Sequence, residues 1–211
     1  MTRRTALACF ALLALAACEE MRTPQTLARI PAALSTGNPD PVLGIVRDAA
    51  EAFQDAGRSL SGNPGALALA AAQLEVMTEE LGRDLRWAPL PPGILFELRG
   101  ARTELRAAIG LRANASPDAA ARALSATQVA LGRGDRAAAL AALSPALFEP
   151  GGERTLDYLT RPGPLPYARN ATAAARDAVD QLLRDNRGGL VGAMDPDASQ
   201  ADMLPGRALG R

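Results

Sequence analysis

Apolar residues recur at alternating spacings of three and four along most of the chain, the period of a helix with one buried face. This pattern predicts helices over residues 40–59, 64–86, 92–111, 117–131 and 170–184. A further helix should begin after Asp135 and end near Pro145, and a shorter one should cover 153–159. No stretch shows the alternation of a strand bounded by turn residues. The chain is therefore predicted to be all-α, an antiparallel array of five or six helices.

Polar residues that stand directly before prolines mark the expected helix starts. Asn38, Asn63 and Ser116 each precede a proline, and a side chain of this kind can accept a hydrogen bond from the first free backbone amides. Asn170 is expected to cap the last helix in the same way. The prolines within 87–93 exclude a continuous helix there, so this segment should form a stiff turn.

The regular pattern has clear limits at both ends of the chain. Residues 38–185 form the predicted helical domain. Residues 186–211 contain several glycines and prolines without any period, and they are expected to be a disordered tail. Residues 18–37 show little periodicity and are expected to be a tether that precedes the domain.

The first eighteen residues follow a different plan. Arg3 and Arg4 lead into an unbroken apolar run over residues 6–17, which is too short to span a bilayer because a span needs about 20 apolar residues. The run ends in the tetrapeptide Leu15-Ala16-Ala17-Cys18. This segment resembles the signal peptide of a bacterial lipoprotein, and the tetrapeptide matches the lipobox of that class residue for residue.

The resemblance implies a specific fate for the N-terminus. Residues 1–17 would be removed, and Cys18 would carry a thioether-linked diacylglycerol together with a fatty acyl group on its amine. The protein would then be held on a membrane by lipid. In this class an aspartate just after the cysteine favours the inner membrane, and Glu19 and Glu20 match that signal imperfectly. We therefore expect an outer-membrane location, with the domain facing the periplasm.

Composition narrows the chemistry of the domain. The chain has no histidine and no lysine, and its only other cysteine, Cys9, lies in the segment that would be removed. The usual bases and nucleophiles are thus largely missing, no metal site or cofactor is predicted, and we expect no enzyme activity. The 23 basic and 23 acidic residues give no general attraction to nucleic acid, so none is expected as a partner.

Three arginines are the most suggestive candidate site. Arg99, Arg102 and Arg106 recur at spacings of three and four, so they share one helix face and could bind a small anionic ligand. The alternative is that acidic residues of the preceding helix, such as Glu75 and Glu79, neutralise this face.

Trp87, next to the proline-rich turn, is a second candidate site, and two interpretations of it are open. Its ring could be exposed as a platform for a partner or for the membrane interface, or it could close one end of the core.

The sequence therefore predicts a lipid-anchored helical protein of the cell envelope that acts as a binding or scaffold component, with an envelope protein as partner. Two alternatives stay open. One is a module that binds a small anion at the arginine face, and the other is a cell-wall hydrolase that uses a pair of carboxylates, since two acids at the right separation suffice for glycoside hydrolysis.

Overall fold

A computed structural model of the chain describes residues 30–34 and 37–193, with side chains as far as Asn186. The chain divides into two compact units, Met1–Ile30 and Pro31–Arg211, and the described residues lie almost wholly in the second. The predictions for the signal peptide and for Cys18 fall outside the described residues, as does the predicted tail from residue 194 onwards.

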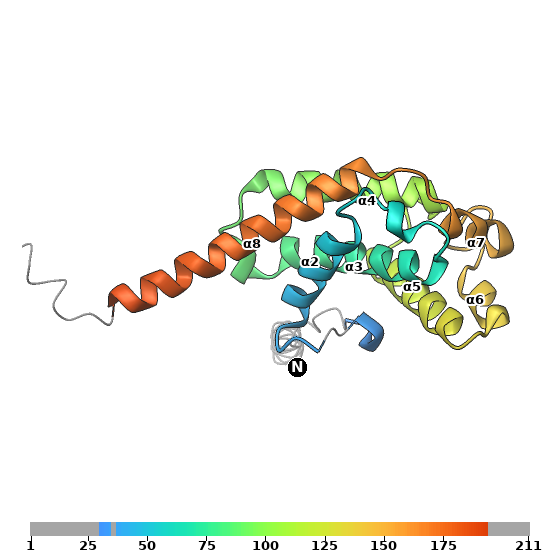
Figure 1. Cartoon of the computed structure of the whole chain (residues 1–211), viewed down its shortest axis with the longest axis horizontal. Helices are drawn as coiled ribbons and strands as arrows, with labels where there is room; N and C mark the ends of the chain where they lie inside the picture. Colours follow the sequence, from blue (N-terminus) through green and yellow to red (C-terminus); the bar gives the residue numbers. More distant parts are fainter. Residues whose placement is uncertain (1–29, 35–36, 194–211) are drawn as a thin grey trace, which may run out of the picture. The chain divides into compact units, whose positions relative to one another are not determined.

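The described part of the chain is all-α, as the sequence predicts (Figure 1). It contains seven α-helices and no strand, and a single isolated bridge joins Leu111 and Phe148. Three short 3₁₀ helices accompany them: η1 (Ala32–Leu34), η2 (Arg58–Leu60) and η3 (Leu85–Trp87). The α-helices are α2 (Pro41–Ala52), α3 (Pro64–Arg83), α4 (Pro92–Ile109), α5 (Pro117–Gly132), α6 (Arg136–Ala142), α7 (Gly152–Thr160) and α8 (Pro166–Ala193).

Helix α3 occupies the centre of this array, where it contacts α2, α4, α5 and α7 (Figure 1). Neighbouring helices run antiparallel. Asp40, just before α2, bonds to Arg86 beyond the end of α3, and Gly65 at the start of α3 lies beside Leu131 near the end of α5. The largest fully buried side chains come from most of these helices and their connections, and they include Ile45, Phe53, Leu67, Leu74, Met77, Leu98, Leu124, Phe148 and Leu159.

Several predicted helix starts are confirmed by their caps. The side chain of Asn63 accepts a hydrogen bond from the Ala66 amide, and Ser116 and Asp135 cap α5 and α6 in the same way. Each cap satisfies one of the amides that a first helical turn leaves free. Local sequence is enough to set these three boundaries.

The first predicted helix begins within one residue of the predicted start, but its expected cap and its predicted end are wrong. Asp40 rather than Asn38 caps α2, because its carboxylate accepts from the amides of Val42 and Leu43 while Asn38 accepts from Asp40 itself. The helix stops at Ala52 instead of continuing to residue 59. Ala56 and Gly57 both adopt positive φ angles, of 60° and 79°, which an α-helix excludes.

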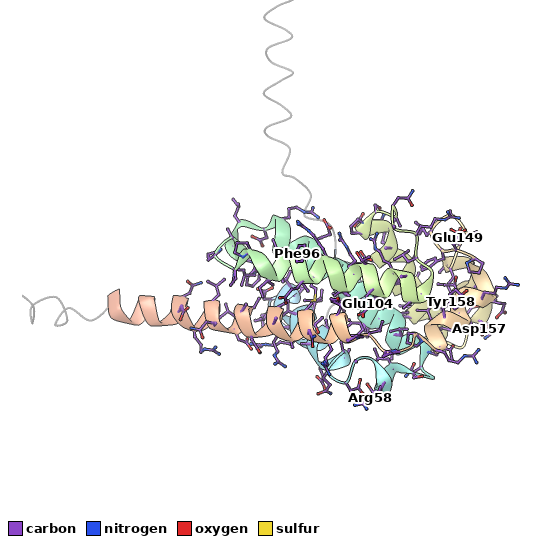
Figure 2. The ribbon with its side chains drawn as sticks, turned by 90° about the horizontal axis from the view of Figure 1, so that it is seen from above. Arg58, Phe96, Glu104, Glu149, Asp157 and Tyr158 are labelled. Atoms are coloured by element: carbon purple, nitrogen blue, oxygen red, sulfur yellow. The ribbon has the colours of Figure 1, made fainter. Side chains whose placement is uncertain are left out.

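The predicted start of the last helix is also wrong, because a side chain from another helix sets it. Helix α8 begins at Pro166, so Asn170 lies inside it rather than at its cap. Glu104 lies on α4 (Figure 2). Its carboxylate accepts hydrogen bonds from the amides of Tyr167 and Ala168 at 3.2 and 2.9 Å. A side chain from a neighbouring antiparallel helix therefore takes the place of a local cap.

The helical domain extends further towards both ends of the chain than the sequence predicts. The segment assigned to the tether includes η1, which contacts α3 and α5 and buries Leu34 to 1% exposure. Helix α8 continues to Ala193, so residues 186–193 are helical and are not part of a tail. The helical domain thus begins by Pro31 and extends beyond residue 185.

Candidate functional site

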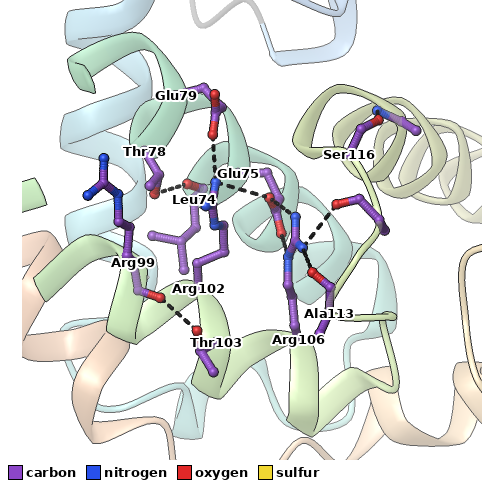
Figure 3. Close-up of polar contacts among 12 residues, drawn as sticks. Leu74, Glu75, Thr78, Glu79, Arg99, Arg102, Thr103, Arg106, Ala113 and Ser116 are labelled. Carbon is purple, nitrogen blue, oxygen red and sulfur yellow. Dashed lines mark hydrogen bonds and ion pairs between the residues drawn. The ribbon is translucent and has the colours of Figure 1, made fainter. Parts of the chain in front are cut away.

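The predicted arginine site lies on α4 where it packs against α3, and Arg106 is its most buried member (Figure 3). Its Nε and Nη2 atoms donate to the two carboxylate oxygens of Glu75 at 2.6 and 2.7 Å. Its Nη1 atom donates to the carbonyl oxygens of Ala113 and Ala115 at 2.9 and 3.0 Å. Arg106 therefore ties α4 to α3 and to the loop before α5.

Glu75 is the other half of this buried pair, and its side chain is only 2% exposed. Burial raises the pKa of Glu75, and the Arg106 guanidinium opposes that rise. The two-point geometry needs both carboxylate oxygens to accept, so it is the geometry of an ionised glutamate facing a guanidinium. The pair leaves little of either charge open to a ligand.

Arg102 and Arg99 differ in their surroundings. Nη1 of Arg102 lies 2.8 Å from a carboxylate oxygen of Glu79 and 4.0 Å from one of Glu75. The Arg99 side chain is exposed, and its guanidinium has no hydrogen-bond or ion-pair partner among the described residues (Figure 3).

Acidic residues of α3 thus neutralise two of the three candidate arginines, Arg102 and Arg106, which is the arrangement expected of the alternative reading. Of the three guanidinium groups, only that of Arg99 is exposed without an acidic partner among the described residues. This face therefore does not present a cluster of free arginines.

An acidic groove of about 390 Å³ lies between α2 and α3 and includes Asp48, Glu51, Ser59 and Gln73 in its lining. Burial raises the pKa of Asp48, and the neighbouring charge of Glu51 adds to the rise. Both carboxylates come from α2, where they stand three residues apart. The two acids of the groove therefore belong to its α2 side.

A second groove, the η1 groove, lies where η1 meets α5 and α6 and has a volume of about 380 Å³. Its walls are mostly small and apolar, from Pro31, Ala32, Ala33, Ala126, Val129, Ala130 and Ala138. The hydroxyl of Ser125 in its lining is buried without a hydrogen-bond partner in the described structure. Arg133, also in the lining, is exposed, and its guanidinium has no charged partner among the described residues.

The turn between α3 and α4 carries a third feature, which the sequence predicted only in part. Trp87 is 3% exposed and closes one end of the core, as one of the two readings proposed. The Arg86 guanidinium lies 4.4 Å from the centre of its ring, within the range of a cation–π contact. The exposed apolar side chains here are instead Leu85 and Phe96, at 86% and 78%.

Helical periodicity could have indicated one of these two residues. Phe96 lies off the apolar stripe of α4, whose buried positions include Leu98, Ala101 and Leu105. Leu85 lies in a 3₁₀ turn, where the period of an α-helix gives no guidance.

The described residues contain no group of three or more metal-ligating side chains, and no helix among them is long and apolar enough to cross a membrane. No protein-family model, curated protein or solved structure matches the chain.

Proposed function

We propose that the chain is a lipid-anchored protein of the bacterial cell envelope whose helical domain acts by binding, as a scaffold or accessory component with a protein partner. The observation that carries the proposal is the tetrapeptide Leu15-Ala16-Ala17-Cys18 after a basic and apolar leader. An outer-membrane location with the domain facing the periplasm is part of the proposal.

The anchor would limit where the domain can act. Twelve residues separate Cys18 from Pro31, the last residue before η1. A fully extended chain of that length spans at most about 40 Å, from a rise of roughly 3.3–3.6 Å per residue. A protein acylated at Cys18 would therefore keep its domain within that distance of the bilayer, where its partners must also lie.

The η1 groove supports binding to a short segment of a partner protein. Its small side chains let another backbone approach closely, and the exposed Arg133 guanidinium offers donors for a partner's carbonyl or carboxylate groups. The alanine side chains that line the η1 groove are uncharged, so they contribute to its shape and not to its charge. The lack of histidine, lysine and a second retained thiol argues for binding over catalysis.

Crosslinking in intact cells, followed by mass spectrometry of captured proteins, tests the proposal. Wild type should capture a partner that the Cys18→Ser variant, which cannot be acylated, captures much less. Ala126→Arg fills the η1 groove and should reduce capture, whereas Ala141→Arg places the same side chain at an exposed position of α6 outside the groove. Equal capture by wild type and Cys18→Ser would contradict the proposal.

A further inference from the structure

The α3–α4 tip, which we define as residues 85–96, exposes apolar side chains that the core does not use. From Trp87 to Phe96 the sequence contains no charged residue. Trp87 and Leu90 point into the domain and are buried, while Leu85 and Phe96 are 86% and 78% exposed. Large apolar side chains exposed at one end of a helical hairpin are typical of a contact surface.

The tip is also stiff. Pro89 and Pro91 lie in the turn, and Pro92 is the first residue of α4. Proline fixes its own φ angle and restricts the residue before it. The backbone hydrogen bonds from Trp87 to Asp84 and from Leu90 to Trp87 hold the rest of the turn. A preorganised surface of this kind loses little conformational entropy when it docks.

The tip is tied to the start of α2, the first α-helix of the array. Arg86 binds the carboxylate of Asp40 through Nη1 and Nη2, at 2.5 and 3.2 Å, so the start of α2 is fixed directly to the tip. Hydrogen bonds from Arg86 and from the amides of α2 hold the pKa of Asp40 below its usual range, although partial burial acts in the other direction. The segment that leads back to Cys18 precedes this contact.

The chemistry of the tip fits a bilayer better than a charged partner. Two arginines beside it have acidic partners, since Arg86 pairs with Asp40 and Asp84, and Arg83 lies 4.0 Å from Glu80. Arg99, one turn after Phe96, is exposed without such a partner among the described residues, and Glu97 next to it is also exposed. Apolar side chains with little net charge around them can enter the boundary between headgroups and acyl chains without anionic lipid.

We propose that the α3–α4 tip docks on the surface of the bilayer that holds the lipid anchor, with Leu85 and Phe96 inserted among the lipid headgroups. This inference rests on the proposed anchor at Cys18. The anchor keeps the domain close to the membrane, and the tip gives it one fixed orientation. The remaining faces of the domain, including the η1 groove, then stay available to a protein partner.

Trp87 is the only tryptophan of the chain and lies inside the tip, so its fluorescence reports on the tip alone. The acylated full-length mature protein is reconstituted into zwitterionic vesicles, with either ordinary or brominated acyl chains. Bromine quenches tryptophan only at short range. We expect Trp87 emission to fall in the brominated vesicles.

The variants Leu85→Ser and Phe96→Ser should each weaken the quenching. Both side chains are exposed, so the melting temperature should not change, and this is measured in parallel. Tyr158→Ser is the matched control, because Tyr158 is an exposed aromatic residue of α7 well apart from Phe96 (Figure 2). Its quenching should equal that of wild type.

Flotation of the protein with the vesicles separates the two proposals. Protein that floats with unquenched Trp87, or with equal quenching in wild type and both tip variants, overturns the docking of the tip and leaves the anchor intact. Protein that carries no acyl group and does not float overturns the anchor itself. A cellular protein crosslinked to the tip, with Trp87 unquenched, would assign this surface to a protein and also overturn the proposal.

Discussion

Arg106 of α4 and Glu75 of α3 form a two-point ion pair in which neither side chain is more than a tenth exposed. The same guanidinium also binds two backbone carbonyls of the loop before α5. One side chain thus joins two helices and a loop that are separated along the chain. Arg106, which the sequence predicts to bind a small anion, therefore holds parts of the domain together instead.

Arg106→Ala should strongly destabilise the domain, because it leaves the Glu75 carboxylate buried without its partner. We expect the free energy of unfolding to fall by about 3–5 kcal/mol, the range for breaking a buried ion pair. Urea denaturation followed by circular dichroism measures the change. The double variant Glu75→Leu/Arg106→Met removes both charges and should recover much of the loss. A single-variant loss no larger than that of an exposed arginine would contradict this role.

Glu104→Ala should remove the cap that α4 supplies to α8. The amides of Tyr167 and Ala168 lose their acceptor, so we expect a loss of about 1 kcal/mol, as for other N-terminal caps. The first turn of α8 should then exchange its amide hydrogens faster. Glu97→Ala, at an exposed position of the same helix, is the control. Equal losses for the two variants would mean that the cap has no energetic role.

Gly110→Ala should be poorly tolerated, whereas Gly100→Ala in the same helix should be harmless. Gly110 ends α4 with a φ angle of 70°, and a Cβ there would lie 2.4 Å from the carbonyl oxygen of Glu149. Gly100 lies within the helix with open space around it, so alanine should stabilise by up to about 1 kcal/mol. The two melting temperatures should move in opposite directions. A fall for Gly100→Ala, or no fall for Gly110→Ala, would contradict this account.

Glu80 should make the stability of the domain depend on pH in a defined direction. Burial raises the pKa of Glu80, although the charge of Arg83 opposes the rise. The folded state then binds a proton at higher pH than the unfolded state does, so the free energy of unfolding falls as pH rises between the two pKa values.

Glu80→Gln removes this titration and is measured by urea denaturation across the same range. Its stability relative to wild type should rise with pH just above the usual pKa of a glutamate, and then level off. An offset that does not change with pH would contradict the assignment.

Local contacts set the helix boundaries that the sequence predicts correctly, and contacts between distant residues set the others. The caps at Asn63, Ser116 and Asp135 lie within three residues of the amides they bind, so the sequence predicts them correctly. The start of α8 depends on Glu104, which lies 63 residues before Tyr167 in the chain. No local pattern contains that information.

The candidate site shows the same division. Helical spacing places Arg99, Arg102 and Arg106 on one side of α4, but the register between α3 and α4 decides which of them meets an acid. The exposure of Leu85 depends on the 3₁₀ turn η3, whose geometry follows from how the proline segment joins two packed helices. The sequence alone identifies these residues as candidates, but it does not predict which of their side chains are exposed to solvent.

The central claim is that Cys18 anchors this helical domain to a membrane by lipid, and intact-mass spectrometry of the protein from bacterial membranes tests it most directly. We expect a chain that begins at Cys18 and carries the added mass of a diacylglycerol and a fatty acyl group. The Cys18→Ser variant should lack that mass and leave the membrane fraction. A wild-type chain without the added mass, recovered in the soluble fraction, would contradict the account.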